Sequence, residues 1–381
     1  MTVGAPPPSS RGAQRRGDPP AGLDCHAWLS RRSATRIMSR FPFAADAHAM
    51  WFKNLTLYKL QSPLRETAEG LQEALAAFAW EPAARFEMQR VGWVPPMGRP
   101  DAPLTHSVGN FHLLCLHEES KLLPASVIRD ALDEKVGEIE HKESRKVRRR
   151  EKDQLKEEVI LDLLPRAFSR HRRTWGYIDA RDGWLVVDTA SARAAEDFVE
   201  HLREALGTLP VALPETKESP QAVMTRWLAE DDIPGDVELG EEAVLEDPRA
   251  EGCEVRVKRQ DLVAEEMRAH IQAGKRVRTL ALTWGERLSC VLDAGLVVKR
   301  LKFLDMVQEQ AAEEEAETPE ERLDVDFSLM SLELQRFYPR LMELFGGERQ
   351  GPAEEDRPSS PDEEATLASE DGITGSATPR A

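Results

Sequence analysis

The spacing of apolar residues along the first part of the chain predicts two strands and a helix. The run at 51–60 mixes aromatic and aliphatic side chains over a short distance and is typical of a strand, as is FHLLCL at 111–116. Apolar residues at helical spacing predict a helix between Pro63 and Trp80, and the Pro-rich run 91–98 predicts a loop.

A longer helical pattern begins near Pro124 and continues through a basic stretch to Leu164, where Pro165 stops it. In the next unit, 183–188 reads as a buried strand. Ser191 is expected to cap a helix that runs to Leu206 and ends at Gly207.

The remaining pattern predicts a second group of strands and helices. Residues 213–252 are expected to form an acidic surface connection with one helix at 225–230. Strands are expected at 254–258, 276–284 and 287–292, the last forming a hairpin with 296–303, and helices at 261–274 and 329–344. Strands and helices do not alternate regularly, which favours an α+β fold with mixed or antiparallel sheets and long helices over a doubly wound one.

Composition adds a domain division and excludes several classes. The chain has 381 residues, of which 41% are hydrophobic, enough for a core and for two or three domains. It contains no apolar run of membrane-spanning length. Its 4 Cys residues lie far apart, which argues against a disulfide scaffold or zinc module and for a reducing compartment. The predicted parts are a disordered extension (1–49, with Met50 as the expected natural start), an α+β part (50–125), a basic helical segment with a dimer-contact tip (126–182), an α+β part with the acidic connection (183–252), an α+β part with the hairpin (253–347) and a disordered acidic tail (348–381).

Charge is segregated along the chain. The net charge of −17 argues, taken alone, against a nucleic-acid ligand. However, residues 142–173 hold 12 basic and 6 acidic groups, whereas 230–251 hold 10 acids and 1 Arg, and 309–322 hold 7 acids and 1 Arg. The sequence therefore describes a dipolar molecule, in which a basic surface and acidic surfaces coexist.

The basic segment is the first candidate DNA-binding site. On one helix, its cations at spacings of three and four would form a stripe roughly 20 Å long, suited to a run of phosphates. The alternative is a solvated helix held by internal salt bridges to Glu151, Asp153 and Glu157. The candidate residues are Lys142, Arg145, Lys146, Arg148, Arg149, Arg150, Lys152 and Lys156, with Arg170 further along.

The second candidate lies on predicted strands. Arg256 and Lys258 share one face of a strand, Arg276 and Arg278 share one face of another, and Arg259 and Gln260 lie at a strand-to-helix junction. Such faces suit a sheet that lines a positive surface, although polar-out alternation explains any single strand as well.

Catalytic and metal-binding patterns are weak. No nucleophile elbow, zinc-protease or P-loop motif occurs. Asp247 and Glu254 only distantly resemble a metal-dependent nuclease site, because Arg256 stands where such a site needs a Lys. His106, His112 and His117 are expected to be surface or core residues. The expectation is a protein with no catalytic residues, no metal and no cofactor.

Several runs resemble a known family. They are MWFKNL at 50–55, GWVPPMG at 92–98, EKD-x-LK at 151–156, LLPRAFSR at 163–170, KRQDL at 258–262, LKF at 301–303 and the segment 324–330. Together they resemble the bacterial recombination-associated protein RdgC family, over about 50–347.

The resemblance implies a function and two sets of contacts. RdgC proteins bind double- and single-stranded DNA without sequence preference, form a ring-shaped homodimer that encircles duplex DNA, and restrain the RecA recombinase; they are cytoplasmic, lie with the nucleoid and are not known as enzymes. By position, 258–260 falls in a segment of DNA contact or ring interface, and Phe168, with Arg166, falls at a dimer contact. The basic helix matches the family in type only. A metal-dependent nuclease, and an acidic protein that acts directly on the recombinase, are the alternatives.

Overall fold

Two antiparallel sheets form the framework of the chain. The computed structural model describes residues 50–250, 252–314 and 316–349. The seven-stranded sheet has the order β2-β4-β5-β6-β1-β7, with β3 paired to β4, and the five-stranded sheet has the order β12-β11-β10-β8-β9. The strands are β1 (Thr56–Leu60), β2 (Gln89–Val94), β3 (Thr105–Val108), β4 (Phe111–Leu122), β5 (Phe168–Asp179), β6 (Trp184–Val187), β7 (Val211–Ala212), β8 (Val237–Glu246), β9 (Glu254–Lys258), β10 (Arg276–Trp284), β11 (Leu288–Asp293) and β12 (Val298–Phe303). This confirms the predicted α+β class.

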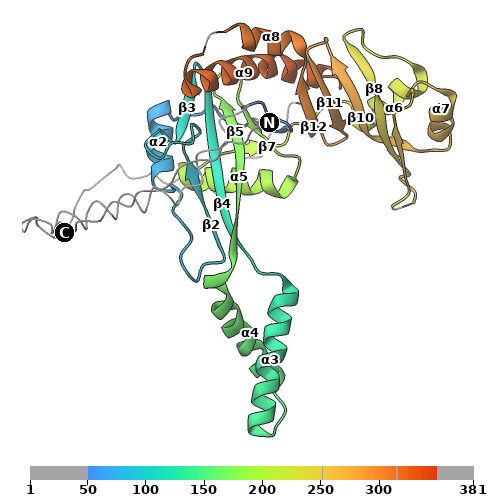
Figure 1. The fold of residues 1–381 in the computed structure, drawn as a ribbon. Coiled ribbons are helices and arrows are strands. Elements are labelled where there is room, and N and C mark those ends of the chain that lie inside the picture. The colour runs from blue at the N-terminus through green and yellow to red at the C-terminus, as the bar shows by residue number, and fades with distance from the viewer. Residues whose placement is uncertain (1–49, 251, 315, 350–381) are drawn as a thin grey trace, which may run out of the picture. The chain divides into compact units, whose positions relative to one another are not determined.

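Helices are inserted between the strands without regular alternation (Figure 1). They are α2 (Ala68–Ala76), α3 (Ala125–Glu143), α4 (Arg149–Leu163), the 3₁₀ turn η1 (Leu164–Arg166), α5 (Ala192–Leu206), α6 (Pro220–Glu230), α7 (Glu265–Gln272), α8 (Asp305–Glu313) and α9 (Pro319–Glu343). Within the described residues, no helix is long and apolar enough to cross a membrane.

Both faces of the seven-stranded sheet are covered by helices. On one face, α2 and α5 bury Leu71 and Phe198 in a cluster with Trp93 of β2. On the other face, Tyr177 of β5 packs against Phe327 of α9, and its hydroxyl bonds to that of Tyr338. The sheet is therefore the centre of a three-layer arrangement.

Helix α9 also contacts the five-stranded sheet. The ring of Phe337 lies 5.4 Å from that of Trp284 on β10, and Glu333 accepts two bonds from Arg287, at 2.5 and 2.7 Å. A single apolar cluster includes Tyr177, Phe337 and residues of both sheets. One helix thus joins the two sheets through aromatic packing and a largely buried ion pair.

Several predictions from the pattern are confirmed. Ser191 caps α5, its Oγ accepting from the amide of Ala194, and the helix ends at Leu206 before Gly207. The strand at 254–258, the strand at 276–284 and the β11–β12 hairpin occur as expected.

Other predictions are wrong. Residues 91–94, predicted as part of a loop, belong to β2. The predicted connection 213–252 contains the strand β8 as well as α6, which includes the helix predicted at 225–230 and begins earlier, at Pro220. These residues pair with distant strands, so local Pro, Gly and acidic content misled the prediction. The predicted disorder at 1–49 and 350–381 lies outside the described residues. Glu348 and Arg349 are placed, each hydrogen-bonded or bridged to the 215–216 backbone.

Lowering the pH should weaken the contact between α9 and the start of β8, because protonation of Asp236 removes its ion pair with Arg340. Arg340 donates two bonds of 2.7 Å to Asp236, and these bonds, with one from Trp284, lower the pKa of Asp236 from 3.8 to about 2. Because the folded pKa lies below the unfolded one, the stabilisation is complete above pH 3.8 and lost as pH falls towards 2. We expect Asp236→Asn to flatten the pH dependence of the unfolding free energy in this window, measured by urea titration. Asp232→Asn is the control; equal slopes in both variants would contradict the assignment.

Candidate nucleic-acid interface

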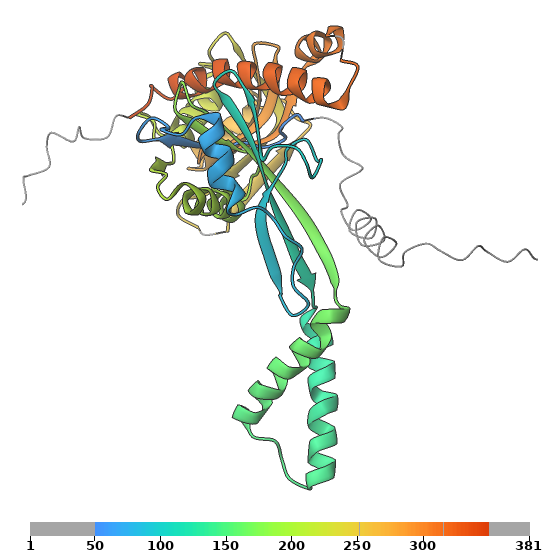
Figure 2. The same cartoon turned by 90° about the vertical axis from the view of Figure 1, so that its left-hand side faces the viewer.

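The basic segment lies on a helical hairpin at the ends of the long strands β4 and β5 (Figure 2). The last ladder pair, Leu122 with Phe168, is followed directly by α3 on one side and preceded by α4 and η1 on the other. Leu132 of α3 and two apolar residues of α4, Leu155 and Val159, are buried in the hairpin. Lys135 on α3 reaches Glu158 and Asp162 on α4, so ion pairs join the two helices.

The predicted continuous helix from 124 to 164 is wrong. Helix α3 ends at Glu143, Ser144 adopts a left-handed conformation with φ of 52°, and α4 starts at Arg149. Each half carries its own apolar residues, so folding back buries more apolar surface than one exposed helix would. The single 20 Å stripe is therefore replaced by a cluster of cations around the turn.

The cations of this cluster fall into two groups. Arg145 is clamped between Glu143 and Glu151, at 2.6 Å to each, and Lys152 pairs with Asp133 at 3.1 Å. These pairs agree with the salt-bridge alternative for Arg145 and Lys152. In the described part of the chain, the other six make no carboxylate ion pair within 4 Å and are exposed: Lys142, Lys146, Arg148, Arg149, Arg150 and Lys156.

Three of these six cations occupy an unfavourable position. Arg148 is the N-cap of α4, and Arg149 and Arg150 begin its first turn. Positive charge at a helix N-terminus opposes the helix dipole, and neighbouring like charges repel. Glu151, in the same turn, is already engaged by Arg145. The arrangement costs local stability and leaves three guanidinium groups available for an external anion.

An exposed apolar patch adjoins the hairpin where β5 begins. Phe168 is 83% exposed, next to Leu122, which is 49% exposed. The loop before β2 brings Met88 alongside, because the amide of Lys121 donates to its carbonyl. Arg166 on η1 and Arg170 on β5 flank the patch and are exposed.

The strand cations gather on one face of the five-stranded sheet, which we call the open face. Its members are Lys258, Arg256, Arg276, Arg278, Thr279, Thr283 and Lys302, all exposed or half-buried. The register brings them together: Lys258 and Arg256 lie opposite Glu242 and Val244, and Arg276 lies opposite Glu246. Leu280 and Leu282 of β10 point to the buried face. The separate strand faces seen in the sequence are therefore one surface.

Carboxylates partly neutralise the open face. Glu254 pairs with Arg256 at 2.6 Å and with Arg278 at 4.0 Å, and Arg300 pairs with Glu242. Within the described ranges, no ion pair within 4 Å is made by Lys258, Arg276 or Lys302. Arg300 and Lys302 were not among the candidates predicted from the sequence. Their position on the predicted strand 296–303, beside the other cationic strands, could have indicated them.

The junction after β9 has a special backbone. Arg259 adopts a left-handed φ of 56°, and Gln260 bonds through its side chain to Glu266 at the start of α7. The guanidinium of Arg300, with help from Lys258 and Arg259, lowers the pKa of Glu242. The junction is thus ordered, with its cations grouped around one carboxylate.

The candidate nuclease carboxylates are not arranged as a metal site. Asp247 accepts from the amide of Arg249 in the β8–β9 turn, and Glu254 is engaged by arginines. Among the described residues, no group of three or more His, Cys, Asp or Glu side chains is placed to hold a metal. His112 and His117 are buried, and burial lowers the pKa of both, as expected for core histidines.

Comparison with known proteins gives a consistent family. The family model described as "Putative exonuclease, RdgC" matches residues 50–348. The recombination-associated protein RdgC of Halorhodospira halophila is 58% identical over 300 residues, covering 79% of this chain and 99% of the relative. The proteins of the same name from Pseudomonas aeruginosa and Aeromonas hydrophila are 45% and 42% identical, covering 78% and 79% of this chain and 98% and 99% of the relatives. With the match extending over both sheets and the hairpin, the chain belongs to the RdgC family.

Proposed function

We propose that this chain is a non-sequence-specific DNA-binding protein that acts as a ring-shaped homodimer around duplex DNA and restrains RecA-mediated recombination, in the cytoplasm with the nucleoid. The observation that carries the proposal is the cluster of exposed cations without carboxylate partners on the α3–α4 hairpin. Membership of a family whose relatives are named recombination-associated supports the link to recombination.

The chemistry of the candidate surfaces favours contact with phosphates. Arginine and lysine side chains on a hairpin turn and on an open sheet face neutralise phosphates and release counterions, without reading base edges. The open face adds Lys258, Arg276 and Lys302. Binding is therefore expected to depend strongly on salt and weakly on sequence, for single as well as double strands.

The net charge of −17 is compatible with this function. The acidic block at 309–322 lies on α8 and the start of α9, outside the hairpin and the open face. By contrast, Glu242 and Glu246 of β8 lie among the cations of the open face and partly neutralise them. Repulsion from the acidic block restricts DNA to the basic surfaces. A homodimer through Phe168 would bring two hairpins together and enclose the duplex between like basic surfaces.

Closure of a ring predicts retention on circular DNA. Protein bound to a relaxed plasmid circle should resist a high-salt wash, because leaving requires opening of the dimer, whereas protein on the same plasmid made linear should slide off its ends. Pull-down of biotinylated protein, with quantification of retained DNA before and after restriction cleavage, measures this. Equal retention on circle and line would rule out the ring while leaving DNA binding intact.

The family description favours a second candidate, an exonuclease. Incubation of duplex and single strands, labelled at either end, with magnesium or manganese distinguishes it. Stepwise shortening of the labelled strand by the wild type, and its absence in Asp247→Asn or Glu254→Gln, would establish the enzyme. Full-length DNA after prolonged incubation would remove this candidate.

A further inference from the structure

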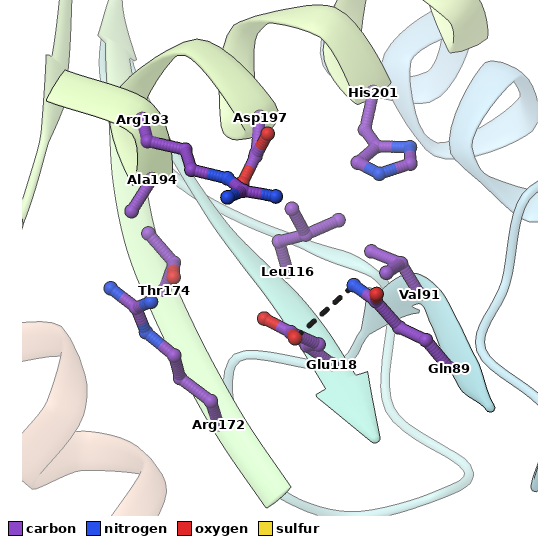
Figure 3. Close-up of a pocket in the computed structure, with 10 residues that line it drawn as sticks. All are labelled: Gln89, Val91, Leu116, Glu118, Arg172, Thr174, Arg193, Ala194, Asp197 and His201. Atoms are coloured by element: carbon purple, nitrogen blue, oxygen red, sulfur yellow. Dashed lines mark hydrogen bonds between the residues drawn. The ribbon is translucent and has the colours of Figure 1, made fainter. Parts of the chain in front are cut away.

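A small cavity lies between α5 and the strands β2, β4 and β5, apart from the cation surfaces described above. Its volume is about 100 Å³. Figure 3 shows Arg193, Asp197 and His201 on the helix facing Gln89, Glu118 and Thr174 on the strands. Drug-sized ligands occupy roughly 300–1,000 Å³, so this cavity suits a small ligand or the edge of a larger group.

The lining combines an apolar floor with both kinds of polar partner. Val91, Leu116 and Ala194 form the floor, and Leu116 and Ala194 are buried. Glu118 accepts a bond of 3.1 Å from Gln89. Although Arg193 and Asp197 lie one helical turn apart, the described residues provide neither with an ion-pair partner within 4 Å. The cavity therefore places a guanidinium donor beside two carboxylates, of which Asp197 has no ion-pair partner within 4 Å among the described residues and Glu118 accepts one bond from Gln89.

This mixture suits a nucleobase better than a phosphate. Two carboxylates, Glu118 and Asp197, balance the charge of the two arginines on the wall, Arg172 and Arg193, so the cavity offers a phosphate dianion no net attraction. A planar base packs on an apolar floor and presents donors and acceptors at its edge. Guanine presents two neighbouring acceptors, O6 and N7, which match an arginine, and two neighbouring donors, the N1–H and N2–H groups, which match carboxylates.

A basic strand leads to the cavity. Arg170, Arg172 and Thr174 lie on one face of β5, opposite Ser120, Glu118 and Leu116 of β4, and Thr174 reaches the cavity wall. Successive side chains on one face of a strand are about 6.8 Å apart. A positively charged track that follows the nucleic-acid backbone is typical of single-strand binding surfaces.

We propose that this cavity is a binding site for an unpaired base, with guanine preferred. Arg193 donates to O6 and N7, Asp197 and Glu118 accept from N1–H and N2–H, and Arg172 and Arg170 hold the neighbouring phosphates. The proposal rests on the proposed DNA binding and adds to it a site for single strands, which duplex DNA does not occupy because its bases are paired.

The test compares short single strands that differ at one position. The full-length protein is titrated into fluorescent thymidine oligonucleotides with a central guanine, adenine, thymine or abasic site, and anisotropy gives the dissociation constants. We expect the guanine strand to bind about tenfold more tightly than the abasic strand, as for one good bidentate base contact. The adenine strand should gain less affinity over the abasic strand than the guanine strand does, because the N1 atom of adenine is an acceptor and would face the carboxylates.

Two variants and a control locate the effect. Asp197→Asn and Arg193→Gln should each reduce the guanine preference towards unity. Glu200→Gln removes an exposed charge from the same helix outside the cavity and should leave the preference unchanged. Thermal melting shows whether each variant is folded.

The outcomes separate this site from the proposed function. A wild-type protein that binds guanine and abasic strands equally overturns the cavity proposal, and so does a preference that survives in both folded variants. Salt-dependent binding of the plain thymidine strand tests the proposed function independently. If the wild-type protein does not bind the thymidine strand at all, the proposed function itself is refuted.

Discussion

Alanine in place of Arg148, Arg149 and Arg150 is expected to weaken duplex binding and reduce its salt dependence. Each phosphate contact contributes about 0.9 to the slope of log K against log salt, so the three lost contacts should lower that slope by about 3 for each hairpin that contacts the duplex. Anisotropy with a labelled duplex over a salt series measures both quantities.

The same substitution should not destabilise the fold. The three guanidinium groups make no carboxylate ion pair within 4 Å among the described residues, and their place at the start of α4 opposes the helix dipole. Relief of this repulsion is expected to leave the melting temperature unchanged or slightly raised. A binding loss without a stability loss separates a ligand surface from a structural one.

The control removes the same charge elsewhere. Arg65, Arg181 and Arg336 are exposed and lie outside the hairpin and the open face, and their replacement by alanine changes the net charge equally. If the two triple variants bind duplex DNA alike, long-range charge explains the effect. If the hairpin variant binds as well as the wild type, the cations at its turn are only a solvated surface.

Loss of the Phe168 ring should dissociate the proposed homodimer. A phenylalanine that is 83% exposed contributes little to the stability of its own subunit, yet a buried aromatic anchor in an interface contributes about 2–4 kcal/mol. Phe168→Ala should therefore weaken dimerisation by about 30-fold to 1,000-fold. Sedimentation velocity and mass photometry over a dilution series measure the change.

A second exposed apolar residue controls for nonspecific association. Leu213 is 59% exposed and lies away from the hairpin along the chain, after β7, so Leu213→Ala should leave the dimer intact. A Phe168→Ala protein that remains dimeric at the lowest concentration would place the contact elsewhere. The circle-retention assay should fail in the same variant, because an open ring cannot hold a circle.

The sequence predicted elements whose signals are local. Helix α5 has a serine cap, a continuous apolar face and a terminal glycine, and all three act within the helix. The β11–β12 hairpin has a short turn between alternating strands. By contrast, β8 lies within an acidic stretch and exists because β10 and β9 pair with its two sides. No local pattern contains that information.

The candidate site was predictable in composition but not in arrangement. The cations of the hairpin could be named from the sequence, whereas their division into clamped and free groups depends on the turn at Ser144. The open face required the register of three strands, which placed Arg256, Lys258 and Arg276 together. The cavity depended on packing of α5 across three strands, which Arg193 and Asp197 alone do not indicate.

The long pairing of β4 with β5 has a mechanical consequence. It runs without a break from Phe111–Asp179, beside the aromatic contacts with α9, to Leu122–Phe168 at the hairpin, a span of about 40 Å. Tension on the hairpin is carried along these two strands, and the backbone hydrogen bonds between them lie across the direction of pull. The ladder is therefore stiff along its length, and a force applied to the hairpin is transmitted to the end of the sheet that packs against α9.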